Sequence, residues 1–247
     1  MKRFLLLIIL GIILMLNTAA YCDVSPADAL KARIEESTKK LTDISFVVTV
    51  VEKNKDALSK MDSNYTTVYE FKNASISMRL PDKMRIEGKL GMVKFEYIIN
   101  GFVKVFRASA VRINKRSDYS HNPAKLQDAL DMGLVTSSIW RGRTVSVVDD
   151  PPAANSGQIK LKLQWPNSEP YSFIWLDAKN LFITRLEKYD GDGKLVMSIN
   201  YTNHQNIGGI IWMPTRMEMR NPSGELVGAI EMSNIKYNTG LPDSLFE

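Results

Sequence analysis

The chain has 247 residues, a formal net charge of +5, 45% hydrophobic residues and a single cysteine. One cysteine excludes a small scaffold held together by disulfides, and so small a charge does not by itself indicate a nucleic-acid-binding protein. The length and the apolar content fit one β-rich domain with its own hydrophobic core.

The first 22 residues have the pattern of a secretory signal peptide. Lys2 and Arg3 precede an apolar run, residues 4–16, that is too short for a transmembrane helix of about 20 residues. We predict cleavage after Cys22, with cleavage after Ala20 as the alternative, and a single mature domain over residues 23–247. Its net charge would be +3, since two cations leave with the leader. The predicted location is the periplasm. A lipid anchor on a retained Cys22 is the alternative, which the bulky Tyr21 before it disfavours.

A helix is predicted soon after the leader. Ser25 can cap it, Pro26 suits its first position, and Leu30 and Ile34 share one apolar face. From residue 44 onward apolar and polar residues alternate with a period of two, interrupted by turns such as Asn100-Gly101. We expect strands over residues 44–51, 66–72, 74–79, 83–89, 92–100 and 102–107, with residues 53–64 as a loop.

The alternation stops at residues 117–121, and a helical segment is predicted from Pro123 to Met132. Leu126 and Leu130 would lie on its apolar face, and Gly133 would end it. A strand follows at residues 158–165, and residues 171–247 read as a chain of hairpins. The predicted fold is mainly β with a few helices: an open antiparallel sheet or partial barrel with one helical insertion.

The sequence contains no clear motif for catalysis or metal binding. His121 and His204 lack further ligands at zinc-binding spacing, and the stretch from Asp190 lacks the final acidic ligand of a calcium loop. Hydrolase, P-loop and dinucleotide-binding motifs are missing from the sequence as well. We therefore expect a binding protein rather than an enzyme, with no cofactor and no metal.

The remaining candidates for a site are apolar. A sheet rich in Met and aromatic residues, with few helices to cover it, favours a concave wall that is only partly filled, because Met adapts to varied apolar shapes. For each single residue, an ordinary packed core is the alternative. The predicted cavity residues are Phe71, Met78, Phe95, Tyr97, Phe106, Trp140, Phe173, Trp175, Met217 and Met219.

Several stretches resemble the LolA/LolB family of outer-membrane lipoprotein-sorting proteins. They are residues 29–46, residues 78–85 (Met-Arg-Leu-Pro-Asp-Lys-Met-Arg), the Ile99-Asn100-Gly101 turn with Phe106, and the ending over residues 238–246. The resemblance covers nearly all of residues 23–247. It implies a half-open antiparallel β-barrel of about eleven strands, with an N-terminal helix and a mid-chain helical lid.

The resemblance also implies a function. A protein of this kind carries the acyl chains of lipoproteins, or a similar apolar lipid, in its cavity towards the outer membrane. Its partners would be an inner-membrane release complex and an outer-membrane acceptor, and it would act as a monomer without nucleic acid. In such carriers an arginine near a proline holds the lid closed, and Arg79 and Arg85 are the two candidates for this lid latch.

The alternative is an envelope sensor on the same fold that recognises lipoproteins or a membrane-protein partner. Basic residues could meet an acidic partner or anionic lipid, although a solvated strand face explains each one separately. These residues are Lys83, Arg85, Lys89, Lys94, Arg112, Lys115, Arg116, Arg141 and Arg143.

Overall fold

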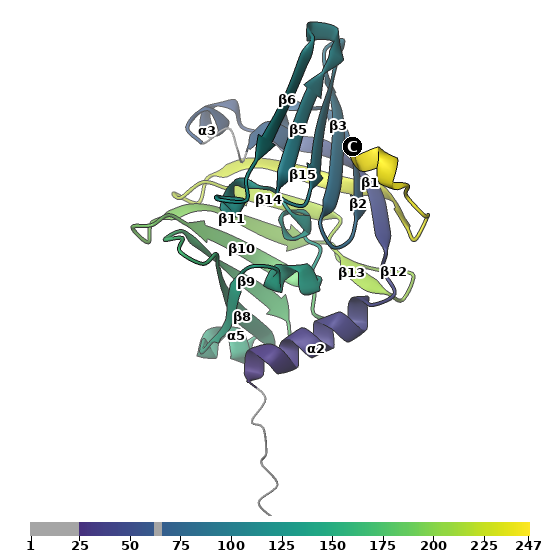
Figure 1. Cartoon of the computed structure of the whole chain (residues 1–247). Helices are drawn as coiled ribbons and strands as arrows, with labels where there is room; N and C mark the ends of the chain where they lie inside the picture. The colour runs from purple at the N-terminus through teal and green to yellow at the C-terminus, as the bar shows by residue number, and fades with distance from the viewer. Residues whose placement is uncertain (1–24, 62–65) are drawn as a thin grey trace, which may run out of the picture.

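The fold is an open antiparallel β-sheet that curves around its own core (Figure 1). The computed structural model describes residues 25–61 and 66–247, so the predicted leader lies outside the described residues. Thirteen strands form the main sheet, in the order β6-β5-β4-β3-β2-β1-β15-β14-β11-β10-β9-β8-β7. The prediction of a mainly β, half-open barrel with a few helices is confirmed, although the main sheet has thirteen strands rather than about eleven.

The elements of the described chain have the following bounds. The strands are β1 (Asp43–Lys53), β2 (Asn73–Arg79), β3 (Lys83–Leu90), β4 (Val93–Asn100), β5 (Val103–Ala108), β6 (Ile113–Asp118), β7 (Thr144–Val148), β8 (Gln158–Gln164), β9 (Tyr171–Asp177), β10 (Ile183–Tyr189), β11 (Leu195–Thr202), β12 (Gln205–Ile207), β13 (Ile211–Met213), β14 (Arg216–Arg220) and β15 (Leu226–Tyr237). The helices are α2 (Pro26–Thr38), α3 (Lys55–Ser59) and α5 (Pro151–Asn155), with 3-10 turns η1 (Thr67–Glu70), η2 (Ser109–Val111), η3 (Pro123–Lys125), η4 (Ala129–Met132), η5 (Ser137–Trp140) and η6 (Asp243–Phe246).

Two meanders make up the two halves of the sheet. Strands β1 to β6 pair in chain order, as do β7 to β11, and the long β15 joins the halves by pairing with β1 and β14. The short β12–β13 hairpin stands apart. Because β6 and β7 are the free edges, the barrel stays open.

Some local predictions differ from the structure. The edge strands β6 and β7 were not predicted, because β6 is almost entirely exposed and its sequence has no clear apolar face. Residues 55–59 form α3 within the predicted loop, where Asn54 caps the helix by accepting a hydrogen bond from Ala57 N–H at 3.1 Å. Residues 67–70 form η1 where a strand was predicted.

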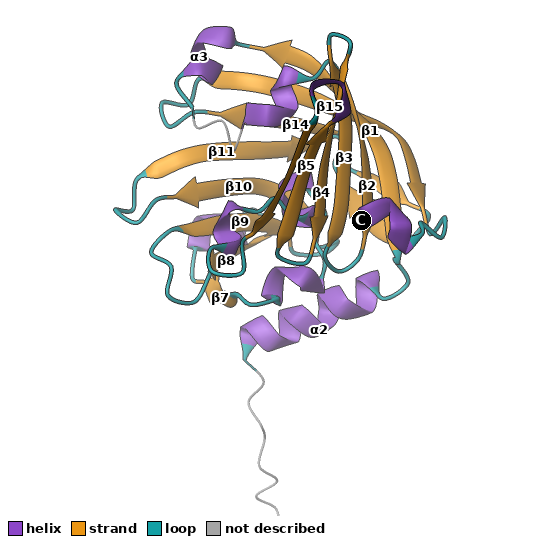
Figure 2. Ribbon diagram, turned by 45° about the horizontal axis from the view of Figure 1, so that its top comes forward, coloured by secondary structure: helices purple, strands orange, loops and turns teal. Residues whose placement is uncertain are grey.

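The N-terminal helix α2 closes one end of the curved sheet (Figure 2). It begins where the sequence predicts, because the Ser25 hydroxyl accepts the Asp28 N–H at 3.1 Å and Pro26 occupies the first turn. Leu30 and Ile34 are buried, and the helix contacts η5 and β7.

Cross-strand pairing decides which side chains face the interior. Ile44, Met78 and Met84 are successive partners across β1, β2 and β3, so they project from the same face. In the other half of the sheet, Ile174 and Leu186 pair across β9 and β10 in the same way. These inner faces supply most of the buried core.

The outer face of β4 and β5 is covered by the C-terminal turn η6, drawn in yellow in Figure 1. Phe246 is buried against Ile98 and Val105 in a second, smaller apolar cluster. The carbonyl of Leu245 accepts a hydrogen bond from the Arg85 guanidinium at 2.9 Å. The C-terminal segment is therefore packed on the convex side of the sheet.

Candidate functional site

The inner face of the sheet is rich in methionine. Alternate positions of the strands put the methionines inside, while their neighbours Arg216 and Glu218 face outward. Unbranched thioether side chains adapt to many apolar shapes, so this wall suits a variable apolar ligand. The buried methionines on the inner face are Met78, Met84, Met197, Met217, Met219 and Met232.

Residues 122–132, here named the plug segment, lie against this wall. They form η3 and η4, joined by an extended residue, Leu126. Leu130 is buried, and Leu126 packs against the core while remaining half-buried. The single helix predicted from Pro123 to Met132 is thus two short turns, because Leu126 has φ −86° and ψ 142°.

The sequence of the plug segment fixes its local shape. The Asp128 carboxylate caps η4 by accepting the N–H groups of Leu130 at 2.9 Å and Asp131 at 3.3 Å, and the Asp131 carboxylate accepts the Asp128 N–H at 3.1 Å. Gly133 ends the turn with φ +77°. A Cβ atom there would overlap the Pro214 ring, so glycine is required.

Two ion pairs connect the plug segment to the rest of the protein. Asp128 pairs with Arg143, which precedes β7, and Asp131 pairs with Lys188 of β10 at 2.7 Å. The side chains of Arg143 and Lys188 are only 12% and 21% exposed. Burial alone would raise the pKa of Asp128, but Arg143, Lys188 and the Asp131 N–H together outweigh it and hold that pKa below its ordinary value.

A third polar contact of the plug segment is buried. The Tyr201 hydroxyl donates a hydrogen bond to the Leu130 carbonyl at 3.2 Å. Burial raises the pKa of Tyr201 well above its ordinary value, so the phenol remains a neutral donor. Polar contacts from three wall residues therefore hold a segment that covers an apolar surface.

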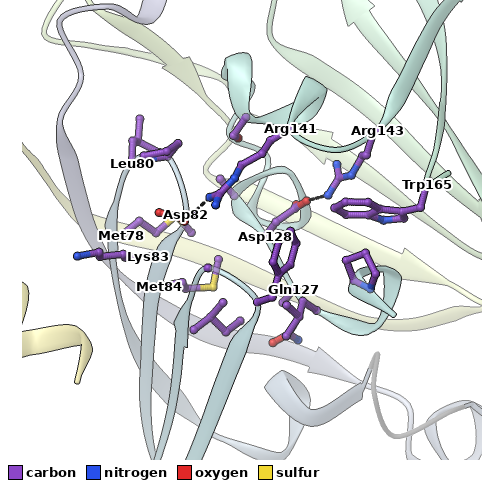
Figure 3. Close-up of a pocket in the computed structure, with 18 residues that line it drawn as sticks. Met78, Leu80, Asp82, Lys83, Met84, Gln127, Asp128, Arg141, Arg143 and Trp165 are labelled. Carbon is purple, nitrogen blue, oxygen red and sulfur yellow. Dashed lines mark hydrogen bonds and ion pairs between the residues drawn. The ribbon is translucent and has the colours of Figure 1, made fainter. Parts of the chain in front are cut away.

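Three cavities surround the plug segment. The largest, about 540 Å³, lies beside β8 to β10 and includes Leu186 and Lys188. A second, about 140 Å³, is lined by Met217 and Met219, and a third, about 70 Å³, by Met84 (Figure 3). Leu126 lines all three cavities. The plug segment therefore forms part of the boundary of all three cavities.

A cation–aromatic cluster lies beside the plug segment, where the two halves of the sheet approach each other. The rings of Phe102 and Trp165 meet edge to face at 6.5 Å, Arg141 lies 5.6 Å over Phe102, and Arg143 lies 4.6 Å over Trp165. Arg141 also pairs with Asp82, as Figure 3 shows. These contacts fix both guanidinium groups at the rim of the third cavity.

Eight of the ten predicted cavity residues lie on the inner face or in contact with the core. Phe71, Met78, Met217 and Met219 are buried, and Trp140 of η5 packs against the core. Phe95, Tyr97 and Phe106 are half-buried on the inner face of β4 and β5. Rings of Phe71, Phe95 and Phe106 follow one another at 6.0 and 5.8 Å, and Tyr97 contacts Phe106 at 4.7 Å. Their role in ligand binding stays a prediction.

The predicted placement of Phe173 and Trp175 in the cavity is wrong. They pair across β9 and β10 with Glu187 and Arg185, and these positions face outward because Ile174 takes the inner face. On the convex side the ammonium of Lys160 lies 4.6 Å and 4.9 Å from the two ring centroids. The alternation predicts the strand correctly, but the face of β9 that lies inside carries Ile174 instead of the two rings.

The two lid-latch candidates also lie on the outer face, so neither holds the plug segment. Arg79 pairs with Asp243 at 2.9 Å, and Arg85 binds the Leu245 carbonyl and pairs with Glu96 at 3.3 Å. Met78 and Met84 occupy the inner positions of β2 and β3, which leaves the arginines outside. Both arginines hold the C-terminal segment instead.

The residues that do hold the plug segment were missed as a group. Lys188 offered one signal: it has the same parity as Leu186 in β10, so it places a charge on an otherwise apolar face. Asp128 and Asp131 offered another, since an acid three residues after a capping acid indicates a short turn. In the sequence, Arg143 is only one of many basic residues.

Within residues 25–61 and 66–247, no three His, Cys, Asp or Glu side chains group as a metal site would require. In the same part of the chain, no helix has the length and apolar character needed to cross a membrane.

Comparisons with known proteins match the chain mainly through its structure. No curated protein matches it. A family model described as "Uncharacterized protein" matches residues 158–247, the part of the chain that contains β8 to β15.

Solved structures of similar fold cover almost the whole chain. One, described as an outer membrane lipoprotein-sorting protein domain from Vibrio parahaemolyticus, has a TM-score of 0.63 and 13% identity and covers 89% of this chain and 95% of its own. A LolA superfamily protein from Nitrosomonas europaea has a TM-score of 0.53 and 14% identity, with 88% and 97% covered. A DUF1329 family protein from Desulfovibrio piger has a TM-score of 0.52 and 16% identity, with 90% and 98% covered. The resemblance to LolA-type proteins is thereby confirmed for the fold.

Proposed function

We propose that this chain, which has the fold of the LolA superfamily, is a carrier that binds the acyl chains of a lipoprotein or a similar lipid. One observation carries the proposal: a methionine-rich concave wall is covered by a segment that polar contacts hold in place. A core that only stabilises the fold would need neither the cavities beside this segment nor the ion pairs that hold it.

The proposed binding step is an exchange of apolar contacts. An acyl chain that enters beside β8 to β10 displaces Leu126 and Leu130 of the plug segment and takes their place on the wall. Each buried methylene contributes about 0.8 kcal/mol. Displacement breaks the ion pairs of Asp128 and Asp131, so a short acyl chain would not bury enough methylenes to compensate. These ion pairs form again when the acyl chain leaves, and this favours release of the ligand.

The compartment and partners belong to the same proposal. If residues 1–22 are an export signal, the mature domain, residues 23–247, works in the periplasm and delivers its ligand towards the outer membrane. An inner-membrane complex would load it, and an outer-membrane acceptor would receive the ligand. The protein of similar fold from Vibrio parahaemolyticus is described as an outer membrane lipoprotein-sorting protein, which supports this proposal.

Tryptophan quenching by brominated acyl chains tests the proposal. The chain has four tryptophans, of which Trp165 lines two of the cavities and Trp175 lies on the convex face. Two variants would each retain a single tryptophan, Trp165 in one and Trp175 in the other, with Phe at the remaining positions. We expect a synthetic lipopeptide with brominated acyl chains to quench Trp165 strongly and Trp175 hardly at all.

Two outcomes would contradict the carrier proposal. Quenching of Trp175 alone would move the binding surface to the convex face. No quenching of either, in variants whose circular dichroism and thermal unfolding match the parent protein, would make the methionine wall a packed core. Native mass spectrometry of the protein purified from its own host, with co-purifying lipid as the expected result, gives an independent check.

A further inference from the structure

The plug segment has the chemical layout of an amphiphile. Its apolar side chains Leu126 and Leu130 lie at the wall, and its carboxylates Asp128 and Asp131 reach two cations. Both carboxylates arise from one short turn, three residues apart. The segment therefore presents apolar groups and two negative charges together.

The two cations belong to the wall of the largest cavity rather than to the plug segment. Arg143 and Lys188 line the cavity of about 540 Å³ together with apolar groups such as Leu163 and Leu186. Arg143 is held in position by Trp165, whose ring lies 4.6 Å from the guanidinium. Among the other charged residues of this cavity, Lys125 adds a positive charge and Glu169 a negative one.

We propose that Arg143 and Lys188 form a headgroup site for an anionic amphiphile, an acyl chain that bears a phosphate or carboxylate. In this proposal, the carboxylates of Asp128 and Asp131 occupy the position that the anionic headgroup takes when the ligand is bound. The inference rests on the proposed function, because the chain must first admit an acyl chain.

Charge balance favours an anionic ligand over a neutral one. When the plug segment withdraws, Arg143 and Lys188 lose the carboxylates of Asp128 and Asp131, and removing one member of a largely buried ion pair is strongly unfavourable. An incoming anion restores the pairing, whereas a neutral lipid does not. The planar guanidinium of Arg143 can bind two oxygens of a phosphate at once, and Lys188 adds a second point charge.

The test compares ligands that share one chain and differ in charge. Dodecyl phosphate, dodecanol and inorganic phosphate are titrated into the full protein, and dissociation constants are measured by calorimetry. The fluorescence of the variant that retains only Trp165 gives a second measurement. We expect dodecyl phosphate to bind at least about tenfold more tightly than dodecanol, the effect of one or two charge-assisted hydrogen bonds. Inorganic phosphate alone should bind at least about tenfold more weakly than dodecyl phosphate.

Variants assign the preference to the two cations. The double variant Arg143→Gln, Lys188→Gln should bind dodecyl phosphate and dodecanol with the same affinity. A matched control, Arg185→Gln with Lys194→Gln, removes the same charges from β10's outer face and the β10–β11 turn and should keep the preference. If the double variant does not fold, Asp128→Asn and Asp131→Asn are added, so that both ion pairs are removed as units.

Each result decides the proposal. Equal binding of dodecyl phosphate and dodecanol by the parent protein would overturn the anionic headgroup and leave the carrier function standing. A preference that survives in the folded quadruple variant would also overturn it. Inorganic phosphate that binds as tightly as dodecyl phosphate would make the site one for a free anion. If neither dodecyl ligand binds, the carrier function itself fails.

Discussion

Asp43, at the start of β1, shows how one carboxylate ties the end of the chain to the sheet. It is buried, and it accepts hydrogen bonds from the Thr239 N–H at 2.8 Å, the Thr239 hydroxyl at 3.0 Å and the Gly240 N–H at 3.0 Å. Burial would raise its pKa, but these donors outweigh it and lower the pKa of Asp43 below 3.8.

The sign of the pH dependence follows from this shift. A carboxyl whose pKa is lowered by folding stabilises the protein above its unfolded pKa, 3.8, and this contribution is lost as the pH falls through the folded pKa. We expect Asp43→Asn to lower the free energy of unfolding by about 1–3 kcal/mol at pH 7. Urea unfolding should show the difference from the parent shrinking towards pH 3. Asp192→Asn, in an exposed turn, is the control, and a difference for Asp43→Asn that does not change with pH would contradict the assignment.

At the same scale, Phe173 and Trp175 show that the sequence can predict a strand without predicting which of its faces lies inside. Their alternation with Ser172 and Ile174 was enough to predict a strand, and the strand is there. Period-two alternation assigns residues to two faces without saying which one is inside, and here both faces of β9 are apolar. Lys160 and Arg185 cover the outer rings, so large aromatic residues remain half-buried on the solvent side.

At the scale of elements, the plug segment depends on the glycine that ends it. Gly133 and Gly157 both have positive φ, +77° and +71°, but only Gly133 has a neighbour, Pro214, where a Cβ would lie. We expect Gly157→Ala to cost about 1–2 kcal/mol for the backbone alone. Gly133→Ala should cost about 1–3 kcal/mol more, because of the overlap. Urea denaturation of the two variants measures the difference, and equal costs would mean that the turn shifts freely.

The C-terminal segment and the plug segment are held by different arginines, and this separation can be tested. Arg85→Gln removes the hydrogen bond to Leu245 and should speed hydrogen exchange of residues 243–247 by about tenfold, with the plug segment unchanged. Arg143→Gln should speed hydrogen exchange in residues 128–132 of the plug segment and leave exchange in residues 243–247 unchanged. Faster exchange of the plug segment in Arg85→Gln would restore this arginine as a candidate for the lid latch.

The sequence predicts the plug segment better than it predicts the C-terminal segment. The plug segment was recognisable as helical from Leu126, Leu130 and Gly133, yet its break at Leu126 depends on the wall that it packs against. The C-terminal segment gave no local signal that it would cover Ile98 and Val105. Long-range contacts of this kind are set by how the sheet curves, which local pattern does not encode.

At the scale of the whole molecule, the curvature of the sheet gives its two faces different roles. Alternation along the strands predicted the open antiparallel sheet, because one-sided burial repeats strand after strand. The two faces then differ in what covers them: inside, the plug segment with cavities around it, and outside, the C-terminal segment together with cations that lie over aromatic rings. The larger cavity, about 540 Å³, lies on the inner face, and a cavity of about 410 Å³ lies on the outer face beside Val105 and Phe246.

Two phenylalanines separate these faces in one experiment. Phe95 and Phe173 are both half-buried and both belong to clusters of rings, but Phe95 lies on the inner face and Phe173 on the outer. Replacing either with Ala should cost about 1.5–3 kcal/mol of stability, since a similar apolar area is lost. Only Phe95→Ala should weaken binding of an acylated lipopeptide, by about tenfold, because only its ring extends the wall beyond the plug segment. Equal weakening in both variants would trace the loss to general destabilisation, and weakening in Phe173→Ala alone would place the acyl chain on the convex face.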